Sequence, residues 1–499
     1  MKLSDLLFGI EVSCGDGILP DTDIRGIASD SRRVENGYLF VCLRGTKSDG
    51  HDHIGEAVAR GAILALVDEG WHSECNIPFI RAANTRSVLA KLWNNFCGRP
   101  SDKLDIVAVT GTNGKTSTTF LLREIFSCAG YKTGLIGTVS CFVGDRDITS
   151  LKSDESHSLL SNMTTPDPES LYQILSVMAS EGVQIVFMEA TSHALELCKL
   201  DALYFKLGLC TNITPEHLDF HGTMEGYFNA KSKLFSMCEK GIINADDNLS
   251  KRLVETAKCP MYTFSAVSDD ADFFADEYLS RGALGIEYLF NSKKSVFRIK
   301  SPIPGKFNLQ NTLLAVSAAR MLDIHPTLIQ DSLKCFFGVP GRMERVSDEN
   351  ECISVFVDYA HTPDALEGLL SSVCDFCKNG ERITLVFGCG GNRDDTKRQT
   401  MGSIASKYAD RVIVTSDNSR DEDSVNIIFD ILRGIDRSKS YMAISDRRDA
   451  IEYAIMSAEK NEVIILAGKG HETYQIKGDK RIEFDEKEIV RGAIQKYHR

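Results

Sequence analysis

The sequence predicts an α/β protein of three domains built around parallel β-sheets. Apolar segments alternate with amphipathic helical segments from about residue 104 to 245, and a second set of apolar segments runs from Ile383 to Leu466. This alternation is typical of strand-helix-strand units whose sheet is covered by helices on both faces. The length of 499 residues also indicates several domains, because one hydrophobic core seldom organises more than about 300 residues.

Glycine and proline residues divide the chain into these domains. The segments G-R-P at 98–100 and G-V-P-G-R at 338–342 contain the helix- and strand-breaking residues expected of domain connections. Ahead of the first segment, short strands surround a helix near Gly55 to Gly61. We therefore predict a small N-terminal α/β domain at 1–97, a central parallel-sheet domain at 98–337 and a C-terminal doubly wound domain at 338–499.

The charge balance restricts the possible partners. The chain has 57 Lys and Arg against 70 Asp and Glu, a formal net charge of -13. This sign disfavours attraction to nucleic acid or to an anionic membrane surface. No secretory leader and no apolar run of about 18 residues is present, so we expect neither membrane insertion nor export. The 15 cysteines, an odd number, are expected to be free thiols in a reducing cytoplasm, and Cys374 and Cys377 to be helix neighbours rather than a metal site.

A glycine-rich turn follows the predicted strand at 106–110. Backbone N–H groups of such a turn, which opens a helix expected from Thr116 to Cys128, can surround a phosphate, while Lys115 reaches the terminal phosphates and Thr116 can bind Mg²⁺. Val109 occupies the first glycine position of the general pattern. The alternative is a turn that only caps a helix. The predicted nucleotide-binding residues are Gly111, Thr112, Asn113, Gly114, Lys115, Thr116 and Ser117.

Two further polar residues follow neighbouring apolar strands. Glu189 comes directly after the strand predicted at 183–188, and His217 follows the strand predicted at 207–211. Carboxyl ends of parallel strands meet at one edge of a sheet, so both side chains are expected near the phosphate turn. Taken singly, each residue is more often a solvated loop residue.

Several longer motifs resemble the Mur ligase family of peptidoglycan precursor synthesis. The resemblance extends over nearly the whole chain. Its motifs are T-G-T-N-G-K-T at 110–116, M-E-A-T-S-H-A-L at 188–195, T-N-I-T-P-E-H-L-D-F-H-G at 211–222, G-K-F-N-L-Q-N at 305–311, G-R-M-E-R-V at 341–346 and V-D-Y-A-H-T-P at 357–363.

Within the family, D-S-R at 30–32, the glycines at 45 and 50 and A-G-K-G-H-E at 467–472 resemble the ligase that adds the third residue of the stem peptide. The resemblance implies a UDP-substrate-binding domain, a central ATP-binding domain and a Rossmann-like domain for the incoming amino acid. It also implies an enzyme that phosphorylates the D-glutamyl carboxylate of UDP-N-acetylmuramoyl-L-alanyl-D-glutamate with ATP and joins the resulting acyl phosphate to an amine. We expect this enzyme to be a monomer in the cytoplasm.

The resemblance also implies roles for individual residues. Thr116 and Glu189 match the positions for one Mg²⁺, while His217 and Lys231, the latter carbamoylated by CO₂, match those for a second metal. Lys115, Glu189, His217 and Lys231 form the implied catalytic set. The remaining implied ATP-site residues are Asn308, Asn311, Arg342, Asp358 and His361.

The implied UDP-substrate site consists of hydroxyl groups and two lysines. Lys199 stands where the family often has arginine, and Leu197 where glutamine can occur, which leaves the individual contacts open. The matching residues are Ser29, Ser31, Thr46, Lys47, Ser48, Thr164, Thr165, Thr191 and Lys199.

The segment S-D-N-S-R at 416–420 indicates which amino acid is added. It resembles the D-N-P-R motif of diaminopimelate-adding enzymes, with Ser419 in place of proline. An arginine at position 420 suits the second carboxylate that distinguishes meso-diaminopimelate from lysine. Glu472 is expected to hold the distal ammonium. The implied amino-acid site comprises Arg393, Asp417, Asn418, Ser419, Arg420, Gly468 and Glu472.

Three alternatives stay open at this point. The chain could add L-lysine instead of diaminopimelate, or be another ligase of the superfamily such as a folylpolyglutamate synthase. From a different class, it could be a nucleotide-binding scaffold without catalysis. Lys115, Thr116, Glu189, His217 and Lys231 are all present, which disfavours the scaffold.

Overall fold

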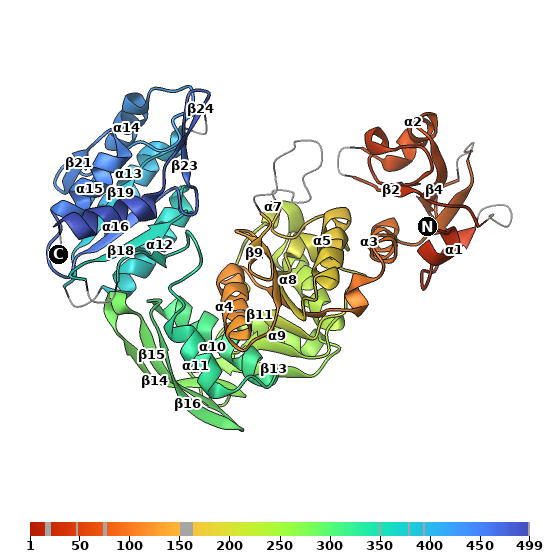
Figure 1. Cartoon of the computed structure of the whole chain (residues 1–499), viewed down its shortest axis with the longest axis horizontal. Helices are drawn as coiled ribbons and strands as arrows, with labels where there is room; N and C mark the ends of the chain where they lie inside the picture. The colour runs from red at the N-terminus through yellow and green to blue at the C-terminus, as the bar shows by residue number, and fades with distance from the viewer. Residues whose placement is uncertain are drawn as a thin grey trace. The chain divides into compact units, whose positions relative to one another are not determined.

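The computed structural model describes residues 1–14, 21–45, 48–72, 77–149, 163–348, 351–377, 380–392 and 395–497. The chain divides into two compact units, and Figure 1 labels the helices and strands described below. Unit 1 consists of Met1–Thr119 and Ala129–Thr263, and unit 2 consists of Phe120–Cys128 and Phe264–Arg499. The domain boundaries predicted near residues 97 and 337 stay predictions.

The N-terminal part of unit 1 is a five-stranded sheet in the order β1-β5-β4-β3-β2. Leu39 and Leu66 pack on one face, toward α3, whereas Phe40 and Val67 pack on the other, toward α2. This two-residue alternation is expected of strands with a helix on each side. The elements are α1 (Leu3–Leu6), β1 (Ser13–Cys14), β2 (Gly26–Ala28), β3 (Tyr38–Val41), α2 (Ile54–Ala59), β4 (Ala62–Asp68), β5 (Phe79–Ala82) and α3 (Thr85–Phe96).

The strands of the central sheet in unit 1 follow the order β13-β12-β11-β6-β10-β7-β8-β9. From β12 to β7 all neighbours are parallel, and β8 and β9 continue the sheet in antiparallel pairing. The parallel sheet predicted from the sequence is therefore present. Its strands are β6 (Asp105–Thr110), β7 (Thr133–Ile136), β8 (Cys141–Val143), β9 (Arg146–Asp147), β10 (Ile185–Glu189), β11 (Leu207–Cys210), β12 (Gly241–Asn244) and β13 (Met261–Ser265).

Strand register brings distant residues to one edge of this sheet. Glu189 pairs with Val109 of β6, and Met188 pairs with Ile136 of β7. The turns that follow β6 and β7 therefore both lie beside Glu189. The helices of this part are α4 (Lys115–Cys128), α5 (Pro168–Ser180), α6 (Ser192–Glu196), α7 (Leu218–His221), α8 (Met224–Ser232) and α9 (Asn248–Thr256).

Unit 2 begins with an antiparallel meander that the sequence analysis did not predict. Its strands β14 (Phe273–Ser280), β15 (Ile286–Ser292) and β16 (Ser295–Ser301) pair in succession. Ile286, Tyr288 and Phe290 of β15 are buried while the residues between them are partly exposed. Two helices follow in the chain, α10 (Lys306–Met321) and α11 (Pro326–Lys334).

The C-terminal sheet of unit 2 is doubly wound, as predicted. Its strand order is β17-β18-β22-β19-β20-β21, and every pair except β17 with β18 is parallel. The strands are β17 (Glu344–Arg345), β18 (Ser354–Asp358), β19 (Ile383–Phe387), β20 (Arg411–Val414), β21 (Ser440–Ala443) and β22 (Val463–Ala467), and β23 (Tyr474–Lys477) pairs with β24 (Lys480–Glu483) in a separate hairpin.

Helices cover both faces of this sheet. One face packs against α12 (Pro363–Phe376), α13 (Thr396–Tyr408) and α14 (Ser424–Leu432), and the other against α15 (Arg447–Met456) and α16 (Glu486–Tyr497). In the V-D-Y-A-H-T-P motif, Thr362 accepts a hydrogen bond from the N–H of Ala365 and Pro363 opens α12. The end of that motif is thus a helix cap, because Ser or Thr before a first-turn proline is a common helix start.

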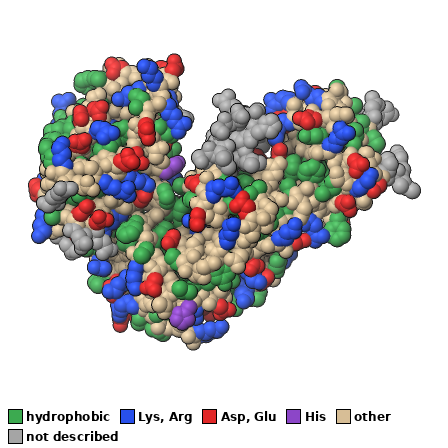
Figure 2. Space-filling model, in the orientation of Figure 1, with side chains coloured by type: hydrophobic (Ala, Val, Ile, Leu, Met, Phe, Trp, Pro, Cys, Tyr) green, Lys and Arg blue, Asp and Glu red, His purple; other side chains and the backbone are tan. Residues whose placement is uncertain are grey.

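The face of the molecule shown in Figure 2 is mixed in charge. On this face, Lys and Arg side chains lie among Asp and Glu side chains.

Among the described helices, none is both long enough and apolar enough to cross a membrane. The described cysteines are free thiols. Cys374 lies in α12 and Cys377 caps it, and burial raises the pKa of Cys377, which opposes the thiolate form that binds metals.

Candidate active site

The phosphate turn between β6 and α4 is held in place by the segment after β11. The N–H of Thr112 donates to the carbonyl of Asn212 at 2.9 Å, and the hydroxyl of Thr112 donates to the carbonyl of Thr214 at 3.0 Å. Gly111 has φ +140°, and a Cβ there would lie 1.9 Å from the Thr211 hydroxyl. The turn therefore requires glycine at this position, both for its backbone conformation and for its close contact with Thr211.

Lys115, the first residue of α4, folds back over the turn. Its Nζ donates to the carbonyls of Gly111 and Thr112, both at 2.8 Å. The ammonium thus lies at the open N-terminus of a 14-residue helix, where the helix dipole also favours an anion. A phosphate oxygen can replace these two carbonyl oxygens as the acceptor of the Lys115 ammonium, because the phosphate is negatively charged and the carbonyls are neutral.

Glu189 is a buried carboxylate that several hydrogen bonds hold in place. It is 1 % exposed, and its carboxylate accepts hydrogen bonds from the Thr116 hydroxyl at 3.0 Å and from the Thr138 N–H at 2.9 Å. Its second oxygen accepts from the Thr138 hydroxyl at 3.1 Å. Carboxylate and hydroxyl oxygens are the hard ligands that Mg²⁺ prefers, so Thr116 and Glu189 fit a magnesium ion. The sequence analysis missed Thr138, although its place after β7 at the same sheet edge was a usable signal.

Lys231 of α8 is almost completely buried beside the phosphate turn. Lys231 is only 1 % exposed. Its Nζ donates a hydrogen bond to the Gly111 carbonyl at 2.8 Å and lies 4.6 Å from the centre of the Tyr227 ring. Burial, followed by repulsion from Lys115, lowers the pKa of Lys231 to about 7. At neutral pH much of this amine is therefore unprotonated and nucleophilic.

His217 is more open than the other predicted metal-site residues. Its backbone is left-handed at φ +55°, and its side chain is 46 % exposed. The ring lies 4.8 Å from the ring of His193, and Nε2 is 3.6 Å from a carboxylate oxygen of Glu216. Within the described part of the chain, no hydrogen bond joins it to Glu189 or Lys231. The structure thus places Thr116 and Glu189 together and Lys231 at the turn, but leaves His217 at the rim.

The predicted UDP-substrate residues fall into separate groups. Thr165 donates its hydroxyl to the Glu189 carbonyl at 2.8 Å and lies 3.1 Å from the Thr191 hydroxyl. The Thr164 hydroxyl lies 3.0 Å from that of Thr138. These three predicted residues therefore extend from the carboxylate site along the same sheet edge.

A second group lines a pocket of about 190 Å³ in unit 1. Ser29 and Lys199 lie in its wall, and the Lys199 ammonium pairs with Asp167 at 2.8 Å. The sequence analysis did not identify the other polar and aromatic residues of the wall, among them Arg33, Arg86 and Trp93. The wall also contains two carboxylates, because Asp167 pairs with Lys199 and Glu169 pairs with Arg33 at 2.8 Å. The third cation, Arg86, donates to the Arg44 carbonyl. The pocket is therefore polar and mixed in charge, with the Trp93 indole at its wall.

The rest of the predicted set lies elsewhere in the N-terminal part. Ser31 is buried and donates to Glu56 at 2.7 Å, and Ser48 lies 2.8 Å from the His53 ring. Both serines are therefore already engaged with protein side chains. Thr46 and Lys47 lie outside the described residues.

The predicted ATP-site residues of unit 2 form two groups. In α10, the buried Asn308 donates its amide to the Pro304 carbonyl at 2.7 Å, and Asn311 reaches Asn308 at 3.5 Å. At the end of β18, Asp358 accepts hydrogen bonds from the N–H groups of Met343 and Ala360, both at 2.8 Å. Burial raises the pKa of Asp358 despite these bonds.

Arg342 and His361 both lie beside Tyr359, the residue that follows Asp358. The Arg342 guanidinium is 5.5 Å from the centre of the Tyr359 ring, and the His361 ring is 4.7 Å from the same ring. His361 Nδ1 is 2.8 Å from the Tyr359 carbonyl. Both side chains are exposed, which leaves them available to a ligand.

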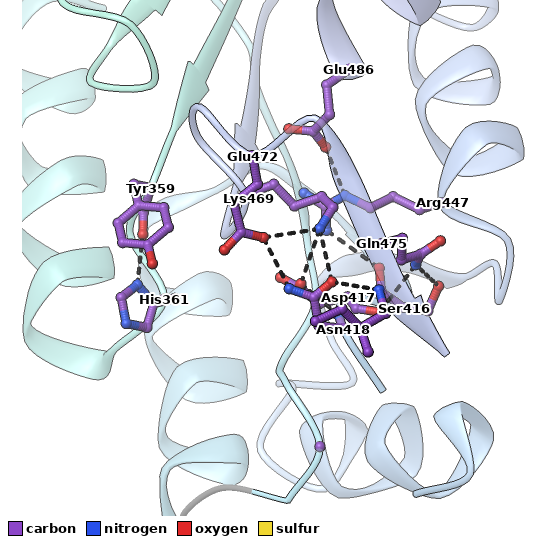
Figure 3. A network of polar contacts seen from close by, with 12 residues as sticks. Tyr359, His361, Ser416, Asp417, Asn418, Arg447, Lys469, Glu472, Gln475 and Glu486 are labelled. Carbon is purple, nitrogen blue, oxygen red and sulfur yellow. Dashed lines mark hydrogen bonds and ion pairs between the residues drawn. The ribbon is translucent and has the colours of Figure 1, made fainter. Parts of the chain in front are cut away.

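The predicted amino-acid site forms at the carboxyl ends of β20 and β22, where two loops meet (Figure 3). Asn418 of the first loop donates its amide to Glu472 of the second at 2.9 Å. Gly468 has φ +115°, and a Cβ there would lie 2.7 Å from Asp417. Ligands of open α/β sheets bind at this edge. The predicted residues Asp417, Asn418, Gly468 and Glu472 are thus brought together.

Arg420 is held in an uncommon conformation at the end of the first loop. Its φ is +51°, its N–H donates to the Ile476 carbonyl, and its guanidinium donates to the Gly391 carbonyl at 2.8 Å. Ser419, which stands where the motif has proline, is buried, and its carbonyl accepts from the N–H of Glu422. Backbone contacts therefore restrain the loop without the proline. Arg393 lies outside the described residues.

Comparisons with known proteins identify the family of this chain. Residues 23–96 match the description "Mur ligase family, catalytic domain", residues 109–319 match "Mur ligase middle domain" and residues 341–470 match "Mur ligase, glutamate ligase domain". A protein of Clostridioides difficile named UDP-N-acetylmuramoyl-L-alanyl-D-glutamate–2,6-diaminopimelate ligase is 42% identical over 99% of this chain and 100% of its own. A protein of the same name from Caldanaerobacter subterraneus is 39% identical over 99% of each chain.

This chain belongs to the Mur ligase family. A solved structure described by the same ligase name is 30% identical, covers 99% of each chain and superposes with a TM-score of 0.73. The family resemblance and the three-domain α/β fold predicted from the sequence are thereby confirmed.

Some polar residues of this Mur ligase site were not predicted. Thr138 binds Glu189, Glu216 lies beside His217, and Lys469 lies between the two loops of the C-terminal sheet. Lys469 is 0% exposed. Lys469 lies inside the A-G-K-G-H-E motif at 467–472, and this position was a usable signal. Only Gly468 and Glu472 of that motif were predicted as site residues.

We predict that Gly468→Ala destabilises the fold more than Gly478→Ala. Both positions have positive φ, which costs an alanine roughly 1–2 kcal/mol. Only the Cβ at 468 would collide with Asp417, because nothing lies within 4 Å of the Cβ at 478. Overpacking adds roughly 1–3 kcal/mol. Thermal unfolding of both variants measures the difference, and equal losses would contradict the close approach of Gly468 to Asp417.

Proposed function

We propose that this Mur ligase adds meso-2,6-diaminopimelate to UDP-N-acetylmuramoyl-L-alanyl-D-glutamate, using ATP, in the cytoplasmic synthesis of peptidoglycan precursors. The observation that best supports diaminopimelate as the added amino acid is the pair of adjoining loops after β20 and β22. They present the Arg420 guanidinium on one loop and the Glu472 carboxylate on the other. The names of the relatives support the same substrates.

The phosphate turn supports phosphoryl transfer from ATP. Lys115 and the N-terminus of α4 would bind the terminal phosphates, replacing the carbonyls of Gly111 and Thr112 that Lys115 now contacts. Thr116 and Glu189 would hold Mg²⁺, which when bound neutralises negative charge on the phosphates. The buried position of Glu189 excludes water and strengthens its electrostatic effect on nearby charges. The products of this step are ADP and an acyl phosphate of the D-glutamyl side chain.

In the second step, the amine of the incoming residue attacks the acyl carbon. The C–N bond forms as the C–O bond to phosphate breaks, and the nitrogen loses a proton, so the products are the amide and inorganic phosphate. Bringing two anions together is the main electrostatic barrier to the first step. Lys115 is placed to lower that barrier because its ammonium lies at the turn.

Lys231 supports carbamoylation. An amine attacks CO₂ only in its unprotonated form, forming an N–C bond and releasing one proton. Burial lowers the pKa of Lys231 to about 7, which makes that form available at neutral pH. The resulting carbamate is an anionic oxygen ligand of the type that Mg²⁺ prefers, whereas the ammonium would repel the ion. His217 would join it as a ligand of a second metal.

The geometry favours diaminopimelate over L-lysine. The two acceptors share an α-amino acid group and a distal amine, but only diaminopimelate has a second carboxylate. Arg420 is a cation on the loop that would receive that carboxylate, and a lysine-selecting site has no need of it. We further propose that the enzyme acts as a monomer.

The first prediction concerns the acceptor. With Mg-ATP and UDP-N-acetylmuramoyl-L-alanyl-D-glutamate, the protein should release phosphate when meso-diaminopimelate is added. L-lysine should be used at least about 100-fold less well, because it leaves the arginine without a partner. Initial rates of phosphate release with each amino acid measure this. Equal turnover with L-lysine would overturn the selectivity.

Arg420→Lys should raise the KM for meso-diaminopimelate roughly tenfold to a hundredfold, because a charge-assisted contact of about 1.5–3 kcal/mol is weakened. The KM for ATP should stay within about twofold. Arg433→Lys is a matched control, because Arg433 is 72% exposed and its one ion pair among the described residues is with the nearby Asp430. An unchanged KM for diaminopimelate in Arg420→Lys would show that Arg420 does not bind this substrate.

Lys231→Ala should reduce turnover at least about 100-fold, the loss typical of removing a group that stabilises developing charge. Added acetate or propionate should restore part of the activity. In CO₂-free buffer the wild-type rate should fall, more so below pH 7, where Lys231 is protonated, and bicarbonate should restore it. Lys233→Ala, which changes an exposed lysine two residues away, is the control. Undiminished activity in Lys231→Ala would refute the carbamate.

A further inference from the structure

A buried ammonium group lies beneath the two loops of the amino-acid site. The Lys469 side chain is 0% exposed, and its Nζ lies 3.1 Å from Asn418 Oδ1, 3.2 Å from Glu472 Oε2 and 3.6 Å from Asp417 Oδ1. Figure 3 shows this nitrogen pointing at all three side chains. A charge removed from water in this way is stabilised only if such partners surround it.

Lys469 determines which way the Asn418 amide faces. Asn418 Oδ1 accepts hydrogen bonds from Lys469 Nζ and from the Ile476 N–H, the latter at 2.9 Å. The amide nitrogen Nδ2 consequently faces Glu472 and donates to its Oε2 at 2.9 Å. A flipped amide would place its NH₂ group against an ammonium and a backbone N–H, so both donors would lose their acceptor.

The same contacts leave one oxygen of Glu472 available. Oε2 accepts from Lys469 and Asn418, whereas Oε1 has no hydrogen-bond partner among the residues that the structure describes. The Glu472 side chain is 15% exposed, and Figure 3 shows its second oxygen directed away from Lys469 and Asn418. The carboxylate is therefore fixed through one oxygen and presents the other.

The charges of this group do not cancel. Asp417 and Glu472 bring two carboxylates, and Lys469 brings one ammonium. Arg447, which is also buried, pairs with Glu486 at 2.7 Å and donates to the Ala467 carbonyl at 2.8 Å. It therefore supports the backbone at the end of β22, and its charge acts on Asp417 and Glu472 through space, with no ion pair to either among the described residues. The Arg420 guanidinium of the same site contacts the Gly391 carbonyl. Among the groups in direct contact, two carboxylates therefore face one ammonium, and the unbonded oxygen of Glu472 suits an incoming ammonium group.

We propose that Lys469 is a positioning residue of the amino-acid site. It fixes Asn418 and one oxygen of Glu472, so that the other oxygen binds an ammonium group of the incoming diamino acid. The inference rests on the proposed function, because it assumes that these loops bind the acceptor. It adds a residue that acts through Asn418 and Glu472 and does not itself touch the substrate.

Lys469→Met and Lys469→Arg test this proposal. In Lys469→Met the KM for meso-diaminopimelate should rise about tenfold to a hundredfold, the effect of losing one charge-assisted contact, while the KM for ATP stays within about twofold. Lys469→Arg, which keeps the charge, should recover part of the loss. Lys480→Met changes an exposed lysine of β24 and should leave both KM values unchanged.

A residue with a merely structural role would lower the unfolding temperature without separating the two KM values, and that outcome would overturn the proposal. If Lys469→Met does not fold, the same KM values are measured for Lys469→Gln. This variant keeps a hydrogen-bond donor to Asn418 but removes the charge. Wild-type protein that releases no phosphate with meso-diaminopimelate would refute the proposed function itself. Wild-type turnover combined with an unchanged KM in Lys469→Met would refute only the role of Lys469.

Discussion

The site in unit 1 depends on the buried carboxylate of Glu189. Parallel pairing places this residue between the turns that follow β6 and β7, and the carboxylate binds Thr116 of one turn and Thr138 of the other. A buried carboxylate is stable only when hydrogen bonds compensate for the lost water. The contacts that stabilise the fold here therefore also fix the oxygen atoms that suit magnesium.

Buried cations have different consequences in the two units. Lys231 has no carboxylate within ion-pair distance among the described residues, so burial and Lys115 lower its pKa to about 7, and it gains the reactivity of a free amine. Lys469 is surrounded by Asp417, Asn418 and Glu472, which stabilise its charge and are oriented by it. The same type of side chain thus serves chemistry in one environment and positioning in the other.

Local patterns in the sequence predicted much of the fold and part of the site. The apolar strands, the glycine turn and the helix that starts near Thr116 depend on neighbouring residues, and they lie within about two residues of their predicted positions. The meander β14 to β16 was missed because β14 and β16 are largely exposed and contain many polar residues, although β15 alternates between buried and partly exposed residues. The pocket residues Arg33 and Trp93 were missed because they come from segments without a motif.

The sequence by itself determined the two sheet-based domains, the phosphate turn and the family, because these follow from local periodicity and contiguous motifs. Only the tertiary structure decided that Thr138 binds Glu189, that Lys231 is buried against Gly111 and that Lys469 orients Asn418 and Glu472. These contacts join residues between 3 and 120 positions apart. Strand register and burial set them, and neither quantity is a property of any short stretch of chain.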